Sequence, residues 1–322
     1  MDKIAIYYGD NLNTGQYDNG VWMDILKIPF IKTVDEAKDY DIIIRTLFIN
    51  KIGFSQKIRK KFPHIIQIGL SDPPLMQISK LNPHEQAAYL RDLRYLDGIM
   101  ALTEEERQWY KTASHKPTIK IGLPFPFESY KRDYNKLSDA KREFIGLGVG
   151  AFSDDRNFIS SFIVFRQLKK KFPYLRGVYM SLPESKISQT SLYAKMGKDI
   201  YIHKRKNMNE FYNILSKCKL VINLVDRNSP GRLQGEAAFF GIPVVGSNKL
   251  ELQNELFPEL AVSPYEVENA VMLAEKMLNG HKASERIVKK AYKNLQKYNY
   301  QHSRKKFDDF LKKIKSDRTG RI

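Results

Sequence analysis

The residues best suited to chemistry lie together in one stretch of the chain, Asn228–Ser247. The sequence there predicts a loop, then a short helix, then a Gly-Ile-Pro turn into a buried strand. Gly231 permits a close backbone approach where the helix starts, and Arg232 and Leu233 carry N–H groups that have no partner inside a helix. Such groups can bind an anion, and the Glu236 carboxylate one turn later can accept hydrogen bonds from sugar hydroxyls. Phosphate donors and a hydroxyl acceptor this close together suit a nucleotide-sugar.

Three more candidates in the second half of the chain come at predicted strand ends, where parallel α/β sheets bind their ligands. Arg156 stands at the start of a helix, and its charged, bidentate side chain suits a diphosphate; pairing with Asp154 or Asp155 is the alternative. His203 and Lys204 come between a strand and a helix. They either flank a nucleotide base and its phosphates or belong to a solvated basic loop.

The first half of the chain supplies candidates on the opposite side of the reaction. Asp72 precedes two prolines that lock its loop, so it is a general base, a ligand for a sugar hydroxyl, or a helix cap. The polar loop Gly9–Gly20 follows the first strand and precedes an apolar helix. Four of its residues are candidates to face the acceptor: Gly15, Gln16, Tyr17 and Asp18. An ordinary strand-to-helix turn needs no ligand and is the alternative.

Short apolar runs alternate with amphipathic helical patterns along the whole chain. The predicted strands include Ile4–Tyr8, Ile42–Arg45, Ile65–Leu70, Gly98–Leu102, Phe144–Gly148, Gly177–Met180, Ile200–His203, Leu220–Leu224 and Pro243–Gly246. Continuous apolar strands between helices argue for parallel sheets covered on both faces, and two such halves argue for two doubly wound α/β domains. We expect an N-terminal acceptor-side domain over residues 1–135 and a C-terminal donor-binding domain over 136–300. A basic helix or tail over 301–322 is expected to pack back on the first domain.

Composition narrows the choice of partners. The chain carries 54 Lys and Arg against 36 Asp and Glu, a net charge of +18 that favours an anionic partner such as nucleic acid, a membrane face or a phosphorylated substrate. The single cysteine, Cys218, excludes an internal disulfide, and its apolar surroundings predict a buried packing thiol. The scattered histidines predict no metal site. No signal peptide and no apolar run of roughly 18 residues is found, so we expect a cytoplasmic protein, either free or peripheral to the membrane.

The run Glu236-Ala-Ala-Phe-Phe-Gly241-Ile-Pro243-Val-Val245 resembles the donor-binding signature of GT-B glycosyltransferases. It is similar in particular to the large retaining family (family 4) that includes sucrose, glycogen and mannosyl transferases. The resemblance implies that Glu236 holds the donor ribose. Where this family has a first Glu that touches the transferred sugar, this chain has Asn228, and the family's Gly-Phe-Gly becomes Ser229-Pro230-Gly231. We expect this loop to line the donor site, although Pro230 has no N–H to offer.

Other segments are similar to the same family. Leu96–Glu106 resembles a strand and helix late in the first domain, and Ile119–Tyr130 resembles the segment that crosses between the domains. The family grips the diphosphate with an Arg and a Lys. Arg156 fits the Lys position, but Ala151 stands at the Arg position, so Arg232 or Lys204 is expected to supply the missing charge. The resemblance implies a GT-B fold, in which two Rossmann-like domains face each other across a cleft.

The resemblance implies transfer of a sugar from a nucleoside-diphosphate sugar to an acceptor hydroxyl, with retention at the anomeric carbon; a true base at Asp72 would instead imply inversion. We expect a UDP-sugar as donor, with a GDP-sugar as the alternative, and no bound cofactor. The basic stretch Ser55–Phe62 suits an anionic acceptor such as a membrane lipid-linked glycan. Duplex DNA is the rival acceptor, as for phage DNA glucosyltransferases of this fold. A non-catalytic sugar-nucleotide-binding protein and an epimerase stay open, and the sequence fixes no oligomeric state.

Overall fold

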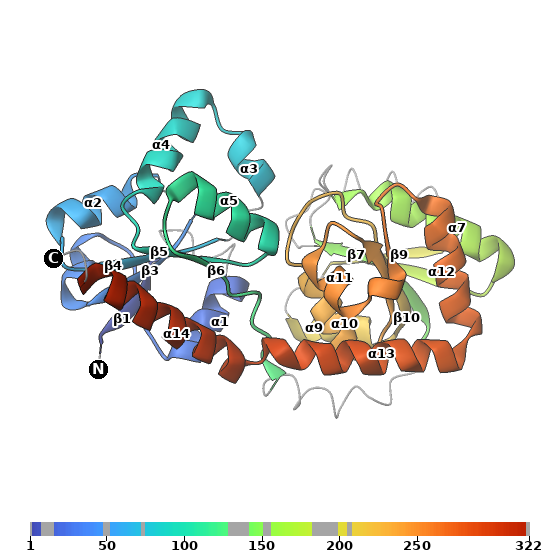
Figure 1. Cartoon of the computed structure of the whole chain (residues 1–322). Helices are drawn as coiled ribbons and strands as arrows, with labels where there is room; N and C mark the ends of the chain where they lie inside the picture. The colour runs from blue at the N-terminus through green and yellow to red at the C-terminus, as the bar shows by residue number, and fades with distance from the viewer. Residues whose placement is uncertain are drawn as a thin grey trace. The chain divides into compact units, whose positions relative to one another are not determined.

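The structure is a computed structural model that describes residues 2–7, 16–47, 52–71, 75–127, 142–150, 156–181, 199–204 and 208–319. The chain divides into two compact units (Figure 1). Unit 1 comprises Met1–Pro126 together with Tyr298–Ile322, and unit 2 comprises Phe127–Lys297. Each unit is built around a six-stranded sheet whose described strand pairs are all parallel. The predicted fold class, two doubly wound parallel α/β sheets, is therefore confirmed.

The sheet of unit 1 has the strand order β2-β1-β3-β4-β5-β6. Its strands are β1 (Ile4–Tyr7), β2 (Phe30–Ile31), β3 (Ile42–Thr46), β4 (Ile66–Leu70), β5 (Gly98–Ala101) and β6 (Thr118–Lys120). Successive residues of β3 enter different cores: Ile42 and Ile44 pack into one hydrophobic cluster and Ile43 into another. Because both faces are covered, these strands are largely apolar, which is the pattern from which they were predicted.

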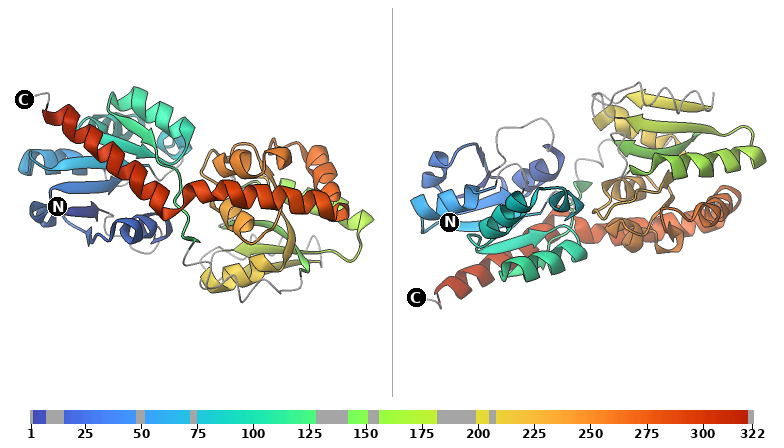
Figure 2. Two further views of the ribbon diagram at one scale, coloured as in Figure 1. Left: turned by 60° about the horizontal axis from the view of Figure 1, so that its bottom comes forward. Right: turned by 90° about the horizontal axis from the view of Figure 1, so that it is seen from above.

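Helices cover both faces of this sheet. On one face lie α1 (Gln16–Leu26) and α14 (Tyr300–Thr319), which share a core that includes Trp22 and Phe307. The other face carries α2 (Phe54–Lys61), α4 (Pro83–Leu93) and α5 (Glu104–Ser114), with the shorter α3 (Leu75–Ser79) and the 3-10 helix η1 (Asp35–Asp39). Figure 2 shows α14 lying against unit 1 in both of its views. The basic tail thus forms part of the core of the unit that begins the chain.

The sheet of unit 2 has the order β12-β11-β10-β7-β8-β9. Its strands are β7 (Phe144–Gly150), β8 (Arg176–Ser181), β9 (Ile200–Lys204), β10 (Cys218–Asn223), β11 (Val244–Ser247) and β12 (Ala261–Val262). Its helices are α7 (Phe158–Lys171), α9 (Met208–Ser216), α10 (Arg232–Phe239), α11 (Glu251–Leu256), α12 (Val267–Asn279) and α13 (His281–Leu295), with the 3-10 helices η4 (Pro258–Leu260) and η5 (Gln296–Tyr298). Cys218 is fully buried in β10, and burial raises the pKa of its thiol to about 12, as expected of a packing residue.

Two aspects of the fold differ from the sequence-based expectation. The strand β2 was not predicted, because a two-residue strand is too short to show a period. The strand β9 ends at Lys204, one residue beyond the predicted range Ile200–His203. Within the described part of the chain, no helix combines the length and the apolar character needed to cross a membrane.

Candidate functional site

The order of strands in unit 2 identifies where a ligand would bind. From β7 the chain moves outward through β8 to β9, whereas β10, β11 and β12 lie on the other side of β7. The direction of winding therefore reverses between β7 and β10, and such a switch point opens a crevice beyond the carboxyl ends of the strands. Gly148 lies in β7 at φ +92°, and a side chain there would approach Asn223 Oδ1 of β10 to 3.4 Å.

The helix α7 starts at this switch point. Its N-cap Asn157 adopts a left-handed conformation (φ +43°), donates from Nδ2 to the Pro264 carbonyl at 2.9 Å and accepts from the Ser160 hydroxyl at 2.9 Å. This buried anchor fixes the position of the preceding residue, Arg156. The Arg156 guanidinium lies near Tyr179, whose pKa rises to about 12 because burial outweighs the opposing effect of the arginine charge. The structure thus places Arg156 at the helix start that the sequence predicted.

The helix α10 starts on the other side of the same switch point. Its N-cap Gly231 adopts a left-handed conformation (φ +81°), and the Leu224 N–H, just after β10, donates to the Ser161 hydroxyl of α7 at 3.3 Å. The starts of α7 and α10 therefore lie at the same edge of the sheet, since they follow the neighbouring strands β7 and β10. Both helix starts direct backbone N–H groups and positive dipole ends to the carboxyl edge of the sheet.

The loop before α10 is fixed by a neighbouring helix. The carbonyls of Ser229 and Pro230 accept from the N–H groups of Glu251 and Leu252 at 3.1 and 2.9 Å. Asn228 is exposed at the start of this loop. These carbonyls serve the first turn of α11, so the loop holds its shape without a ligand.

Glu236 lies one turn into α10 and is 3% exposed. The Arg232 Nε donates to its Oε1 at 3.2 Å, an (i, i+4) pair in which the arginine side chain keeps 25% of its exposure. Leu233 is buried beside them. The sequence assigned Arg232 to phosphate and Glu236 to sugar hydroxyls; in the structure the two groups bind each other. A ligand that uses both must therefore exchange this internal pair for its own contacts.

A chain of buried amides holds the start of α10. Gln253 donates from Nε2 to three backbone carbonyls, those of Val244, Phe257 and Leu260, which fixes the orientation of its amide. Its Oε1 accepts from Gln234 Nε2 at 3.3 Å. The Gln234 Oε1 then points at Gly231, where a Cβ atom would lie only 2.9 Å away. Glycine is therefore required at this N-cap both by its φ and by its close neighbour.

Three residues at the same edge were missed by the sequence analysis. Asp226 follows β10 and binds Lys249 Nζ and the Tyr265 hydroxyl, both at 2.5 Å; these partners follow β11 and β12. The Lys249 and Tyr265 hydrogen bonds hold the pKa of the Asp226 carboxyl below its usual range. Each residue lies within a few positions of the end of its strand, so the rule that identified Arg156 would have found them as well. Tyr265 is 65% exposed and presents its ring at this edge.

The remaining donor-side candidates, His203 and Lys204, lie at the carboxyl end of the edge strand β9. His203 and Lys204 are the last two residues of the edge strand β9, so the strand is longer than predicted and they do not follow it. His203 Nε2 lies 3.8 Å from the Glu210 carboxylate. The strands β8 and β7 separate these residues from the start of α10, so the structure does not bring them directly to Glu236.

The candidates of unit 1 are less completely described. Asp72 and Gly15, like Ala151 of unit 2, lie outside the described residues. Gln16, Tyr17 and Asp18 belong to the first turns of α1, which corrects their assignment to a loop. Polar residues occur at the start of a helix as well as in a loop, so polarity did not distinguish the two.

A buried carboxylate was missed in unit 1. Glu106 Oε2 accepts from the Ser71 hydroxyl at 2.7 Å and from the Leu102 N–H at 3.0 Å. These residues directly follow β4 and β5, so Glu106 ties together two strand ends. Burial raises its pKa to about 6. Among the residues that the structure describes, no group of His, Cys, Asp and Glu is placed to hold a metal ion.

Comparison with known proteins shows the fold. No protein-family model and no curated protein matches the sequence. The UDP-forming α,α-trehalose-phosphate synthase of Burkholderia xenovorans matches in structure with a TM-score of 0.73 at 13% identity, over 95% of this chain and 80% of that one. Sucrose-phosphate synthase of Thermosynechococcus elongatus gives 0.72 at 13% identity, over 95% and 81%. The trehalose-6-phosphate protein of E. coli bound with UDP-2-fluoro glucose gives 0.69 at 14% identity, over 91% and 77%.

The chain therefore has the GT-B fold, with its two parallel six-stranded α/β sheets. It resembles glycosyltransferases that use nucleotide-sugars, at 13–14% identity. That site consists of two helix starts at one switch point, a cation at one of them and a buried carboxylate at the other. Such a set can hold a diphosphate and a polyhydroxyl group together.

Proposed function

We propose that the protein transfers a sugar from a nucleoside-diphosphate sugar to an acceptor hydroxyl. The observation that carries the proposal is the pairing of the α7 and α10 starts at the β7–β10 switch point, with Arg156 and Glu236 on them. The shared fold with nucleotide-sugar glycosyltransferases supports it. UDP-glucose is the first donor to test, because the E. coli relative holds a UDP-2-fluoro glucose.

Each residue has a defined part in the proposed reaction. The leaving group is a nucleoside diphosphate that gains negative charge, which the first N–H groups of α10 and the Arg156 guanidinium stabilise. Glu236 accepts hydrogen bonds from the ribose hydroxyls after Arg232 turns from it toward the phosphates. We propose retention at the anomeric carbon, with the leaving phosphate assisting removal of the acceptor proton. Asn228 takes the position next to the transferred sugar.

The proposed acceptor is anionic, since the chain carries a net charge of +18. A lipid-linked glycan at a membrane surface is favoured, and duplex DNA is the rival. Binding to anionic vesicles but not to duplex DNA would support the lipid; the reverse result would support DNA. Either interaction should weaken as salt rises, because it rests on charge.

A thermal-shift screen with UDP-, GDP- and ADP-glucose tests the donor, because a ligand that binds the folded state raises the melting temperature. We then expect Arg156→Ala to lower kcat more than it raises KM for the donor. Arg166→Ala is the matched control, since Arg166 is an exposed arginine within α7, whereas Arg156 precedes the start of that helix. Loss of donor binding with unchanged kcat would contradict a role on the leaving phosphate. Donor binding without turnover across acceptors would instead indicate a sugar-nucleotide-binding protein.

A further inference from the structure

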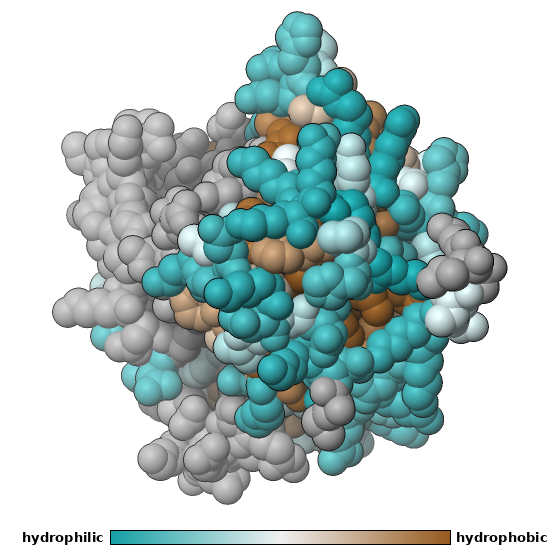
Figure 3. Space-filling model, turned by 90° about the vertical axis from the view of Figure 1, so that its left-hand side faces the viewer, coloured by the Kyte–Doolittle hydropathy of each residue, from teal (hydrophilic) through white to brown (hydrophobic). Residues whose placement is uncertain are grey.

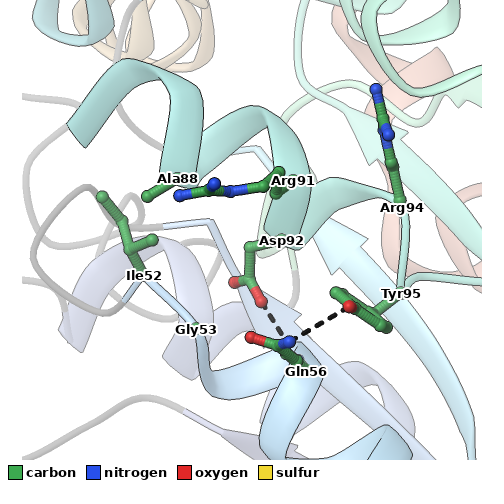
Figure 4. A pocket seen from close by; sticks show the side chains of 8 residues that line it. All are labelled: Ile52, Gly53, Gln56, Ala88, Arg91, Asp92, Arg94 and Tyr95. Atoms are coloured by element: carbon green, nitrogen blue, oxygen red, sulfur yellow. Dashed lines mark hydrogen bonds between the residues drawn. The ribbon is translucent and has the colours of Figure 1, made fainter. Parts of the chain in front are cut away.

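A pocket of about 470 Å³ lies within unit 1, between α2 and α4. It is separate from the donor-side residues, all of which belong to unit 2. Figure 4 shows the side chains that line it. They are Ile52, Gly53, Gln56, Ala88, Arg91, Asp92, Arg94 and Tyr95. The two helices that form its walls pack directly on each other, so the pocket belongs to the fixed part of the unit.

The negative charges around this pocket are already neutralised. Asp92 is 3% exposed; its Oδ2 binds the buried Arg45 guanidinium and its Oδ1 accepts from the Gln56 N–H at 3.1 Å. Asp97, just beyond α4, is held by Arg59 at 2.6 Å and by the Gln67 N–H at 2.8 Å. Neither carboxylate is available to a cation. The pocket therefore does not suit a positively charged ligand.

Two positively charged side chains, in contrast, line the pocket. Arg91 lines the pocket from the last turn of α4 and Arg94 from its C-cap, and both are exposed. Within the described part of the chain, neither side chain has a hydrogen bond or an ion pair with another residue. In Figure 4 the Arg91 side chain reaches along the α4 wall toward Ala88, whereas the Arg94 side chain extends away from Arg91.

Other groups at the pocket complete a set of hydrogen-bond donors. Gln56 Nε2 donates to the Tyr95 hydroxyl at 3.1 Å, which leaves the Tyr95 O–H free to donate to a ligand. Gly53 begins α2 at φ +87°, and no atom lies within 4 Å of the point where a Cβ would stand, so the backbone here is open. Figure 3 shows that hydrophilic side chains cover most of the described surface on this side of unit 1.

We propose that this pocket binds a phosphate group. Arginine presents a planar fork of N–H donors that matches phosphate oxygens, and two arginines balance the charge of a phosphate monoester. The volume leaves room for the group that carries the phosphate, and Ile52 and Ala88 offer it an apolar wall. That carrier is either a small soluble metabolite or a lipid headgroup. The proposal does not depend on the proposed transferase activity, because it uses no residue of unit 2.

The test uses the full chain, labelled with ¹⁵N-glycine, and inorganic phosphate as the probe. We expect a saturable shift of the Gly53 amide resonance, with its affinity lowered about tenfold or more in R91Q/R94Q, because each arginine gives charged hydrogen bonds. The control K289Q/K293Q removes two exposed lysines of α13 and should leave the Gly53 titration unchanged. The Gly231 amide reports the donor site separately. All four substitutions are at exposed positions, and an unchanged melting temperature verifies folding.

A second arm distinguishes the source of the phosphate. Sedimentation with vesicles of phosphatidylglycerol in phosphatidylcholine is compared for the wild type and both double variants. Binding that only R91Q/R94Q loses supports a lipid headgroup, whereas a phosphate titration at Gly53 without vesicle binding supports a soluble phosphate ester. The proposal is overturned if R91Q/R94Q changes neither the Gly53 titration nor vesicle binding.

Discussion

The buried carboxylate of Glu106 should make the stability of unit 1 depend on pH. This carboxylate is 3% exposed, and its Oε2 accepts from Ser71, Leu102 and Thr103 at 2.7 to 3.2 Å. Two effects oppose each other: the three hydrogen bonds favour the ionised form, and burial favours the neutral form. Burial is the larger, so the pKa rises from 4.5 to about 6. Glu106→Gln replaces the ionisable group with a neutral one of the same shape that can keep the three accepted hydrogen bonds.

The sign of the effect follows from the direction of the shift. A carboxyl with a raised pKa binds its proton more tightly in the folded chain, so its contribution to stability is complete below pH 4.5 and is lost as the pH rises past 6. A shift from 4.5 to about 6 corresponds to about 2 kcal/mol. We therefore expect the unfolding free energy of E106Q relative to the wild type to increase by about 2 kcal/mol between pH 4 and pH 7.

Tryptophan fluorescence during urea unfolding measures this difference. The chain has only two tryptophans, Trp22 in α1 and Trp109 in α5, so the signal reports unit 1 alone. Comparing the two proteins at each pH cancels the titration of all other carboxyls. A difference between them that stays constant from pH 4 to pH 7 would refute the reasoning, since it would mean that the hydrogen bonds offset the whole cost of burying the charge.

Three further substitutions test other parts of the structure. Glu236→Ala should weaken binding of UDP-glucose by about 1–3 kcal/mol through loss of a charged hydrogen-bond partner; an unchanged affinity in calorimetry would remove Glu236 from the site. Gly231→Ala should destabilise unit 2 by about 2–4 kcal/mol, because it adds left-handed strain and a contact with Gln234; thermal unfolding by calorimetry measures it, and a neutral effect would contradict the required glycine. Asp92→Ala should destabilise unit 1 by about 3–5 kcal/mol, because the buried Arg45 would lose its partner; a loss below about 1 kcal/mol in urea would show that water replaces the carboxylate.

The elements around the switch point were predictable because their signals are local. The helices α7, α9 and α10 lie where the sequence predicted a helix, after Arg156, Lys204 and Gly231, since each is preceded by a polar or glycine residue. The order of strands was not readable in the same way. It depends on which strands pair across the sheet, and that choice is made by packing between distant segments. The reversal between β7 and β10 came from the structure.

Within the candidate site, contacts between residues of one helix could be predicted from their spacing. Contacts between different helices could not. Arg232 and Glu236 are one turn apart, so their proximity follows from the helix itself. The sequence nevertheless assigned them to different parts of a ligand, because it cannot show which partner a charge takes in the free protein. The link from Gln253 to Gln234 joins two helices, and no pattern in the chain marks it. Glu106 was hidden for another reason: it is the third residue after the N-cap Thr103, where a glutamate is ordinary.

The return of α14 to unit 1 has a consequence for synthesis of the protein. Phe307, Phe310, Leu311 and Ile314 belong to the hydrophobic core of unit 1, and Gly98 of β5 leaves the space that Ile314 fills. The second unit is one continuous segment and can fold on the ribosome as soon as Lys297 has emerged. The first unit is translated earlier, but its core stays incomplete until α14 has been synthesised. Until then one apolar face of its sheet is exposed. We therefore expect a chain stopped at Lys297 to be captured by chaperones or to aggregate, and soluble expression of that truncated chain with a native-like Trp22 signal would contradict this.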